Sequence, residues 1–145
     1  MFYGEYFHSI DRKGRLILPA KFRETAKSQF IEKFFVTRGL DKCLFMLSEE
    51  EWRSQENKLK AMPFTKQQSR TFNRLYFSGA VEVVFDSQGR ILLPQNLKEY
   101  AEIKKDVVIV GVSSRIEIWA KDKWHEFYGN SRQSYEEIAE KLMDA

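Results

Sequence analysis

Short apolar runs separated by polar turn residues recur along the chain and predict β-strands. The run at 6–10, YFHSI, is followed by the polar loop DRKG and then by a second apolar run, LIL, at 16–18. Two such runs joined by a short loop that contains glycine predict a β-hairpin. Pro19 comes next. Because proline cannot donate to a sheet but fits the first turn of a helix, we expect a short helix over 20–26.

The same pattern returns 75 residues later, so the chain contains an internal repeat. Segment 4–26 aligns with segment 79–101, and eight of the 23 aligned positions are identical. The identical pairs include Gly4/Gly79, Asp11/Asp86, Gly14/Gly89, Arg15/Arg90 and Pro19/Pro94. Two copies suit a pseudo-twofold pair and are too few for a solenoid. We expect one domain of two interlocking halves, 1–64 and 65–145, the second with a helical tail, since roughly 70 residues alone give a marginal core.

The remaining hydrophobic pattern completes each half. Apolar strand pairs are expected at 34–39 with 43–47 and at 107–112 with 115–120. Ser48 and Glu51 stand at the spacing of a capping box, which predicts a helix that is interrupted at Pro63. A second helix is expected to start at Thr65. Together these elements predict an α+β fold.

The composition fits a packed globule, because 43% of the residues are hydrophobic and 14% are aromatic. Cys43 is the single cysteine, which excludes an internal disulfide and suits a reducing cytosol; we interpret it as a small core residue. The N-terminal segment lacks the regions of a signal peptide, and no run approaches the ~18 apolar residues of a membrane span. We expect a soluble cytoplasmic protein that does not contact the membrane.

Residues suited to catalysis are scarce in this sequence. His8 and His125 have no cysteine or second histidine at metal-ligand spacing, and no glycine-rich phosphate loop occurs. The acidic run at 49–51 opens the predicted helix, where carboxylates favour the helix dipole. We therefore expect no enzyme activity, no metal and no cofactor. A small hydrolase or nuclease would need a metal or an acid–base pair that the sequence does not show.

The hairpin loops are the best candidate site. In the first tip, residues 11–15, and in the second tip, residues 86–90, Asp comes first, Gly fourth and Arg fifth. This order suits a type I turn followed by a left-handed glycine, with the Asp bonded to backbone N–H groups. A two-stranded ribbon is narrow enough to enter the DNA major groove, where Arg15 and Arg90 can fork onto guanine or phosphate. Alternatively, these residues merely close and solubilise a hairpin.

Charge distinguishes the two tips. The net charge of +3 is too small to indicate nucleic-acid binding by itself, but residues 12–42 carry nine Lys or Arg against three acids, and residues 124–145 carry two bases against five acids. We expect the first tip to supply more of the phosphate attraction and Gln88 to reach a base edge. The expected DNA-binding residues are Arg12, Lys13, Gly14, Arg15, Gln88 and Arg90, oriented by Asp11, Asp86 and Gly89, and the basic surface extends to Lys21 and Arg23.

The segments GEYFHSIDRKGRLILPAKFR and FDSQGRILLPQNLKEYA resemble the MraZ family, whose members carry two copies of an Asp-x-x-x-Arg motif in this setting. The similarity extends through VTRGLDKCLF, FSGA and VGVSSRIEIW to about Trp124. Each repeat also resembles the swapped-hairpin half-domain of AbrB-type transcription factors. The resemblance implies a pseudo-twofold, duplicated swapped-hairpin β-barrel with flanking helices, in which the tips read DNA.

The same resemblance implies a sequence-specific bacterial regulator of the division and cell-wall gene cluster, including its own promoter. Its partners would be double-stranded DNA with repeated promoter sites and further copies of itself in a ring-shaped homo-oligomer associated with the nucleoid. The alternative is an oligomeric scaffold whose hairpins serve assembly and whose acidic C-terminal helix docks a protein. For that scaffold, Arg15→Ala and Arg90→Ala would leave function intact.

Overall fold

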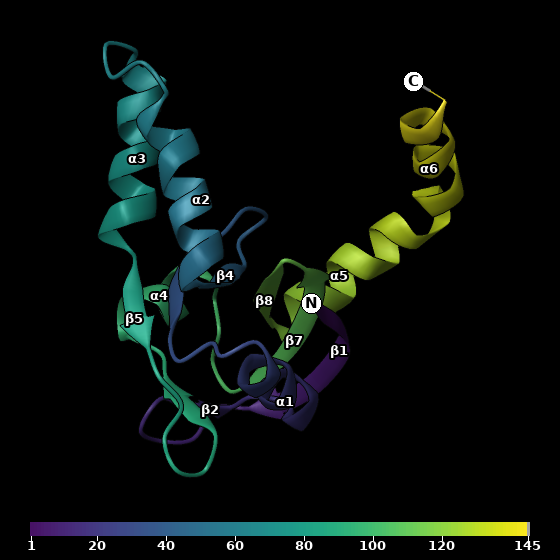
Figure 1. Ribbon diagram of the computed structural model, residues 1–145. Helices are drawn as coiled ribbons and strands as arrows, with labels where there is room; N and C mark the ends of the chain where they lie inside the picture. The colour runs from purple at the N-terminus through teal and green to yellow at the C-terminus, as the bar shows by residue number, and fades with distance from the viewer. Residues whose placement is uncertain (145) are drawn as a thin grey trace.

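The computed structural model describes residues 1–144 and shows a mixed α+β protein (Figure 1). In chain order the elements are β1 (Phe2–Ser9), β2 (Arg15–Ile17), α1 (Ala20–Ser28), β3 (Phe34–Arg38), β4 (Leu44–Ser48), α2 (Glu49–Lys60), α3 (Gln67–Ser78), β5 (Val81–Val83), β6 (Arg90–Leu92), α4 (Gln95–Tyr100), β7 (Asp106–Ser113), β8 (Arg115–Ala120), α5 (Lys121–Ser131), the 3₁₀ turn η1 (Arg132–Ser134) and α6 (Tyr135–Met143). The predicted α+β class is therefore confirmed, and short helices follow both Pro19 and Pro94 as expected.

All strand pairs are antiparallel and form two sheets. The larger sheet has the order β1-β7-β8-β4-β3-β5, and the smaller pairs β2 with β6. Strand β1 of the first half pairs with β7 of the second, and β5 of the second half pairs with β3 of the first. Each half therefore places its first two strands against strands of the other half.

Two strand pairings bring together residues that are equivalent in the two halves, as expected at a pseudo-twofold axis. In the small sheet Leu16 is opposite Ile91, its equivalent at the 75-residue offset. In the large sheet Phe45 is opposite Glu117, its equivalent at the weaker 72-residue offset. The neighbouring pairs are arranged symmetrically about these two. The internal repeat of the sequence is thus also a repeat in space.

Two expectations about the strands were wrong. Only the isolated bridge between Ile10 and Leu16 joins the two runs of the expected local hairpin, because β1 pairs with β7 and β2 pairs with β6 instead. The strand pairing also does not close a barrel: within residues 1–144, the outer strands β1 and β5 of the large sheet each pair on one side only. The exchange of strands between halves replaces the local hairpin pairing.

The first helical pair begins and breaks close to the predicted positions. Ser48 caps α2, since its Oγ accepts from the backbone N–H of Glu51 at 3.2 Å, as the capping box predicted. Helix α3 begins at Gln67, and the expectation of a start at Thr65 was wrong. The reason is a turn after α2, in which the N–H of Lys66 donates to the carbonyl of Pro63 at 3.2 Å and encloses Thr65.

One apolar core joins the two sheets. Leu16 and Ile91 of the small sheet are 0% and 1% exposed and share a cluster with Val36 and Met46 of the large sheet. Each buried aliphatic side chain contributes about 1.5–3 kcal/mol, which explains how three-residue strands such as β2 and β6 are held in place. Cys43 is fully buried, as interpreted from the sequence, and its burial raises the pKa of the thiol.

Helices flank the large sheet at two places. Helices α2 and α3 form a pair in which the Trp52 ring stacks between Phe35 and Tyr76, at 4.9 and 5.4 Å. Helix α5 is anchored through Trp124, whose ring meets Trp119 of β8 at 5.3 Å. Helix α6 continues outward from α5, away from the sheets (Figure 1). Among residues 1–144, no helix is long and apolar enough to cross a membrane.

Candidate nucleic-acid interface

The first tip is a tight turn organised by Asp11. The Asp11 carboxylate accepts from the backbone N–H groups of Lys13 and Arg15, both at 2.9 Å, and from Nε of Arg15 at 2.7 Å. The N–H of Gly14 donates to the carbonyl of Asp11 at 3.0 Å, and Gly14 has a φ of 81°. Glycine adopts this left-handed conformation at little cost, so the predicted turn chemistry is confirmed.

The second tip repeats the same geometry with a different interior. Asp86 accepts from the N–H of Gln88 at 2.8 Å, from the N–H of Arg90 at 2.9 Å and from Nε of Arg90 at 2.8 Å. Gly89 has a φ of 78°. The turn is therefore set by Asp and Gly, while the two residues between them are free to differ.

Hydrogen bonding keeps both tip carboxylates ionised. Backbone N–H bonding, first from Arg15, lowers the pKa of Asp11, and bonding from Arg90 does the same for Asp86. Each Asp engages only the Nε atom of its arginine. Within residues 1–144 no hydrogen bond uses the terminal Nη atoms of Arg15 or Arg90. Each guanidinium is thus held at Nε, while its Nη atoms keep their hydrogen-bonding capacity; the side chains of Arg15 and Arg90 are 31% and 21% exposed.

The small sheet presents both arginines on one face. In its register Arg15 is opposite Leu92 and Arg90 is opposite Ile17, whereas Leu16 and Ile91 between them point into the core. Ile17 and Leu92 are 43% and 59% exposed. The outer face of the ribbon therefore alternates guanidinium and aliphatic groups, and aliphatic groups can contact the methyl group of thymine.

Each tip is also tied to the opposite half of the chain. The N–H of Leu18 donates to the carbonyl of Gly89 at 3.1 Å, and the N–H of Leu93 donates to the carbonyl of Gly14 at 2.9 Å. These two bonds are equivalent at the 75-residue offset. The spacing between the tips is therefore fixed by the protein backbone.

Two basic side chains from the following helices reach across to the tips. Arg23 of α1 lies so close to Gly89 that a Cβ there would be 2.6 Å from Cδ of Arg23, and Nε of Arg23 donates to the carbonyl of Leu18 at 3.1 Å. Lys98, the equivalent residue in α4, brings its Nζ within 3.2 Å of a Cβ at Gly14. The repeat aligned positions 23 and 98, but nothing in the sequence showed that each faces the opposite tip.

The charges at the tips are unequal, as the sequence indicated. Arg12 and Lys13 are exposed at the first tip, where the second has Ser87 and Gln88. The two tips with Arg23 and Lys98 gather six basic residues against two acids, and both acids are already bonded to arginine. Lys21 is exposed on α1 and adds to the same basic surface.

Away from the tips, possible metal ligands do not form a cluster within residues 1–144. Residues 1–144 contain no group of three or more His, Cys, Asp or Glu placed to hold a metal ion. Burial, with the charge of Arg23, lowers the pKa of His8, and His125 packs its ring against Phe7 at 6.1 Å.

Comparison with known proteins shows which family carries this pair of tips. The sequence matches the family described as "MraZ protein, putative antitoxin-like" over residues 1–75 and again over 76–145, so that each match contains one tip. The chain belongs to the MraZ family. The resemblance noted in the two tip motifs is therefore confirmed.

Relatives within the MraZ family match along nearly their whole length. The protein named "Transcriptional regulator MraZ" in Pelotomaculum thermopropionicum is 56% identical over 144 residues, 99% of this chain and 97% of the relative. The proteins of the same name in Acetivibrio thermocellus and Carboxydothermus hydrogenoformans are 56% and 52% identical, over 98% and 99% of this chain and 96% and 98% of theirs. These names describe regulators of transcription and no enzyme, in agreement with the expectation from the sequence.

Proposed function

We propose that this protein is a DNA-binding transcriptional regulator that reads short DNA sites with its two tips. The observation that carries the proposal is the repeated geometry in which an ionised Asp holds Nε of an Arg whose Nη atoms stay open. A guanidinium oriented in this way fits guanine or a phosphate through two parallel hydrogen bonds. The names of the relatives support the same function.

In this proposal, different residues of the tips contact the bases, contact the phosphates and maintain the turn geometry. Arg15 and Arg90 face outward from the ribbon and make the base contacts, with Gln88 able to bond adenine. The two strands lie about 5 Å apart, and the major groove is about 12 Å wide, so the ribbon and its side chains fit the groove. Arg12, Lys13, Arg23 and Lys98 neutralise phosphates on either side. Asp11, Asp86, Gly14 and Gly89 hold the geometry of the tips.

The unequal tips give the bound protein a direction on DNA. The first tip is cationic and the second is neutral, so one orientation on an asymmetric site is favoured over its reverse. Copies of the chain that bind in the same orientation suit direct repeats. We propose that a ring-shaped homo-oligomer engages such repeats and that linked weak contacts raise its apparent affinity. By resemblance, the repeats lie upstream of the division and cell-wall genes, including the gene of this protein.

We further infer that the strand exchange is a duplicated form of the AbrB-type swapped hairpin. The exchange of β1 and β5, together with the symmetric pairing of β2 with β6, supports this inference. We propose 1–64 and 65–145 as the two structural halves, with the boundary in the turn between α2 and α3. The family matches divide the sequence at residue 75.

Fluorescence-anisotropy binding of the full chain tests the proposed function. The probe is DNA from upstream of the gene that encodes the protein, the competitor is scrambled DNA of equal length, and salt is varied. We expect a preference of about a thousandfold for the upstream DNA and a log–log salt slope of several units. Equal affinity for both DNAs, or a flat slope, would contradict DNA reading and favour a protein scaffold.

A further inference from the structure

The outer face of the small sheet carries one exposed aliphatic side chain from each half. In the runs LIL at 16–18 and ILL at 91–93, the flanking residues are buried, whereas the central residues, Ile17 and Leu92, are 43% and 59% exposed. An antiparallel ribbon with one face toward water normally alternates apolar residues inside with polar residues outside. Both runs break this alternation at their central residue.

The break in the alternation is repeated in the second half. Ile17 and Leu92 are equivalent at the 75-residue offset, as Arg15 and Arg90 are. A single exposed apolar side chain is common on protein surfaces and needs no explanation. Two of them at equivalent positions, on the face that also carries both tip arginines, indicate a contact that is made twice.

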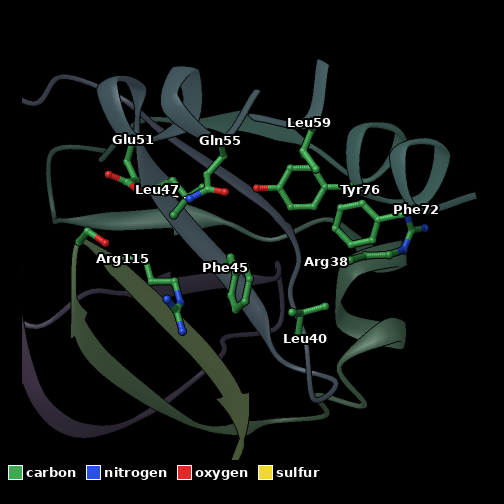
Figure 2. A pocket seen from close by; sticks show the side chains of 11 residues that line it. Arg38, Leu40, Phe45, Leu47, Glu51, Gln55, Leu59, Phe72, Tyr76 and Arg115 are labelled. Atoms are coloured by element: carbon green, nitrogen blue, oxygen red, sulfur yellow. Dashed lines mark hydrogen bonds between the residues drawn. The ribbon is translucent and has the colours of Figure 1, made fainter. Parts of the chain in front are cut away.

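The ribbon face is separate from the apolar pocket between α2, α3 and β4. In that pocket, partly exposed aromatic residues have neighbours within the chain (Figure 2). Phe72 stacks on Tyr76 with ring centres 5.5 Å apart, and the guanidinium of Arg115 lies 4.8 Å from the ring centre of Phe45. The small sheet and the tips lie at the opposite end of the molecule from α2, α3 and α6 (Figure 1). Packing in this pocket therefore does not explain Ile17 and Leu92.

The register places each aliphatic group beside an arginine of the other half. Leu92 is directly opposite Arg15, and Ile17 is directly opposite Arg90. Leu92 also reaches the first tip, since its Cδ1 would lie 3.7 Å from a Cβ at Gly14. Side chains opposite each other in an antiparallel pair lie about 5 Å apart, and successive bases of a DNA strand lie about 3.4 Å apart. An aliphatic group beside an arginine that binds guanine therefore meets a base edge within about two base pairs of that guanine.

We propose that Ile17 and Leu92 are specificity-determining residues that contact the methyl groups of thymines beside the guanines bound by Arg90 and Arg15. The inference rests on the proposed function and adds a second base to what each tip reads. Thymine is the one of the four DNA bases that presents a methyl group in the major groove, and apolar side chains are its usual partners. The amino group of a cytosine at that place would lose water without gaining a hydrogen bond, so the aliphatic group also selects against cytosine.

Replacement of thymine by uracil tests the contact, because uracil lacks the methyl group and keeps every hydrogen-bonding group of the base. The DNA from upstream of the gene and a scrambled duplex are each prepared with thymine and with uracil throughout. Anisotropy gives the affinity of the full chain for all four duplexes. We expect the wild type to lose about fourfold in affinity for each contacted methyl group, and so about tenfold or more on the upstream DNA. The affinity for the scrambled duplex is expected to change little.

Variants of the two aliphatic residues show whether they make the contact. Ile17→Ala and Leu92→Ala truncate exposed side chains and leave the tip arginines in place. Each is expected to bind the thymine-containing upstream DNA more weakly and to show an effect of uracil that is about fourfold smaller. The double variant is expected to bind the thymine and uracil forms alike. Arg12→Ala is the matched control, since it weakens binding through phosphates and is expected to keep the full effect of uracil.

The wild type alone decides between the inference and its failure. Equal affinity for the thymine and uracil forms of the upstream DNA would overturn the inference, while a kept preference over scrambled DNA would leave the proposed function intact. An undiminished effect of uracil in a double variant that circular dichroism shows to be folded would also overturn it, since the methyl groups would then act through other residues or through DNA shape. Equal affinity for upstream and scrambled DNA with thymine would contradict the proposed function and this inference with it.

Discussion

Nε of Arg15 lies 2.7 Å from Oδ2 of Asp11, and the equivalent atoms of Arg90 and Asp86 lie 2.8 Å apart in the second half. Exposed ion pairs of this kind add little to stability, because water and salt screen them. Their effect is on orientation: the carboxylate fixes one edge of a guanidinium that would otherwise sample many rotamers. The tips are therefore preorganised before any DNA is present.

Replacement of Asp11 separates orientation from charge. Asp11→Asn removes a negative charge from the tip, which favours phosphate contact, but it also weakens the bond that aims Arg15. We expect weaker binding to specific DNA and equal or tighter binding to scrambled DNA. Competition anisotropy with both DNAs measures the ratio. A preserved preference for the specific site would show that Asp11 does not orient Arg15.

The pH dependence of the first tip follows from the lowered pKa of Asp11. The folded-state pKa lies below the ordinary value of 3.8, so the stabilisation from this pair is present above that value and is lost as the pH falls through the folded-state pKa. We expect a carboxyl NMR titration of Asp11 with a midpoint below 3.8. In Arg15→Ala the midpoint moves upward but not fully, because the backbone N–H groups of Lys13 and residue 15 still donate. A midpoint at or above 3.8 in the wild type is the contrary result.

We expect the first tip to account for more of the salt dependence of DNA binding than the second. Arg12→Ala and Lys13→Ala each remove an exposed positive charge, so each is expected to reduce the log–log salt slope by about one unit on every DNA sequence. Gln88→Ala at the second tip removes no charge and is expected to leave the slope unchanged. Anisotropy titrations at several salt concentrations give these slopes. Equal slopes for all three variants would mean that the first tip does not contact phosphates.

Gly89 is required both for its backbone conformation and for the space that Arg23 occupies. Gly89→Ala places a side chain at a φ of 78°, which costs about 1–2 kcal/mol, and crowds Cδ of Arg23. We expect the loss of unfolding free energy to be smaller in an Arg23→Ala background. Gly14→Ala, whose neighbours are Lys98 and the carbonyl of Leu93, is the matched control and is expected to be insensitive to Arg23. Denaturant unfolding measures all four differences, and additivity at Gly89 would contradict the contact.

The sequence predicted the local chemistry of the tips but not the partners of their strands. The order of Asp, Gly and Arg specifies a turn within five residues, so Asp11 and Gly14 behave as expected. Whether β2 pairs with β1 or with β6 depends on packing between segments that are 75 residues apart, which local pattern does not encode. A local hairpin was therefore predicted where the halves exchange strands.

Residues that act across the halves were missed for the same reason. From the sequence, Arg23 was predicted to extend the basic surface of its own repeat, and Lys98 was not predicted to belong to the site. Each lies against the opposite tip. The apolar spacing of Ile138 and Leu142 predicted a helix correctly. It did not show that the helix leaves the body of the protein, because amphipathicity does not tell whether a stripe is covered by the same chain or by another.

The central claim is that Arg15 and Arg90 read DNA, and one measurement tests it most directly. Anisotropy binding to the upstream DNA is compared for the wild type, Arg15→Ala, Arg90→Ala and the double variant. The control Arg53→Ala removes the same charge from an exposed position on α2. We predict about a tenfold to hundredfold loss of specific affinity for each tip variant, loss of site preference in the double variant, and no effect of the control. A folded double variant that keeps the wild-type preference would contradict the account.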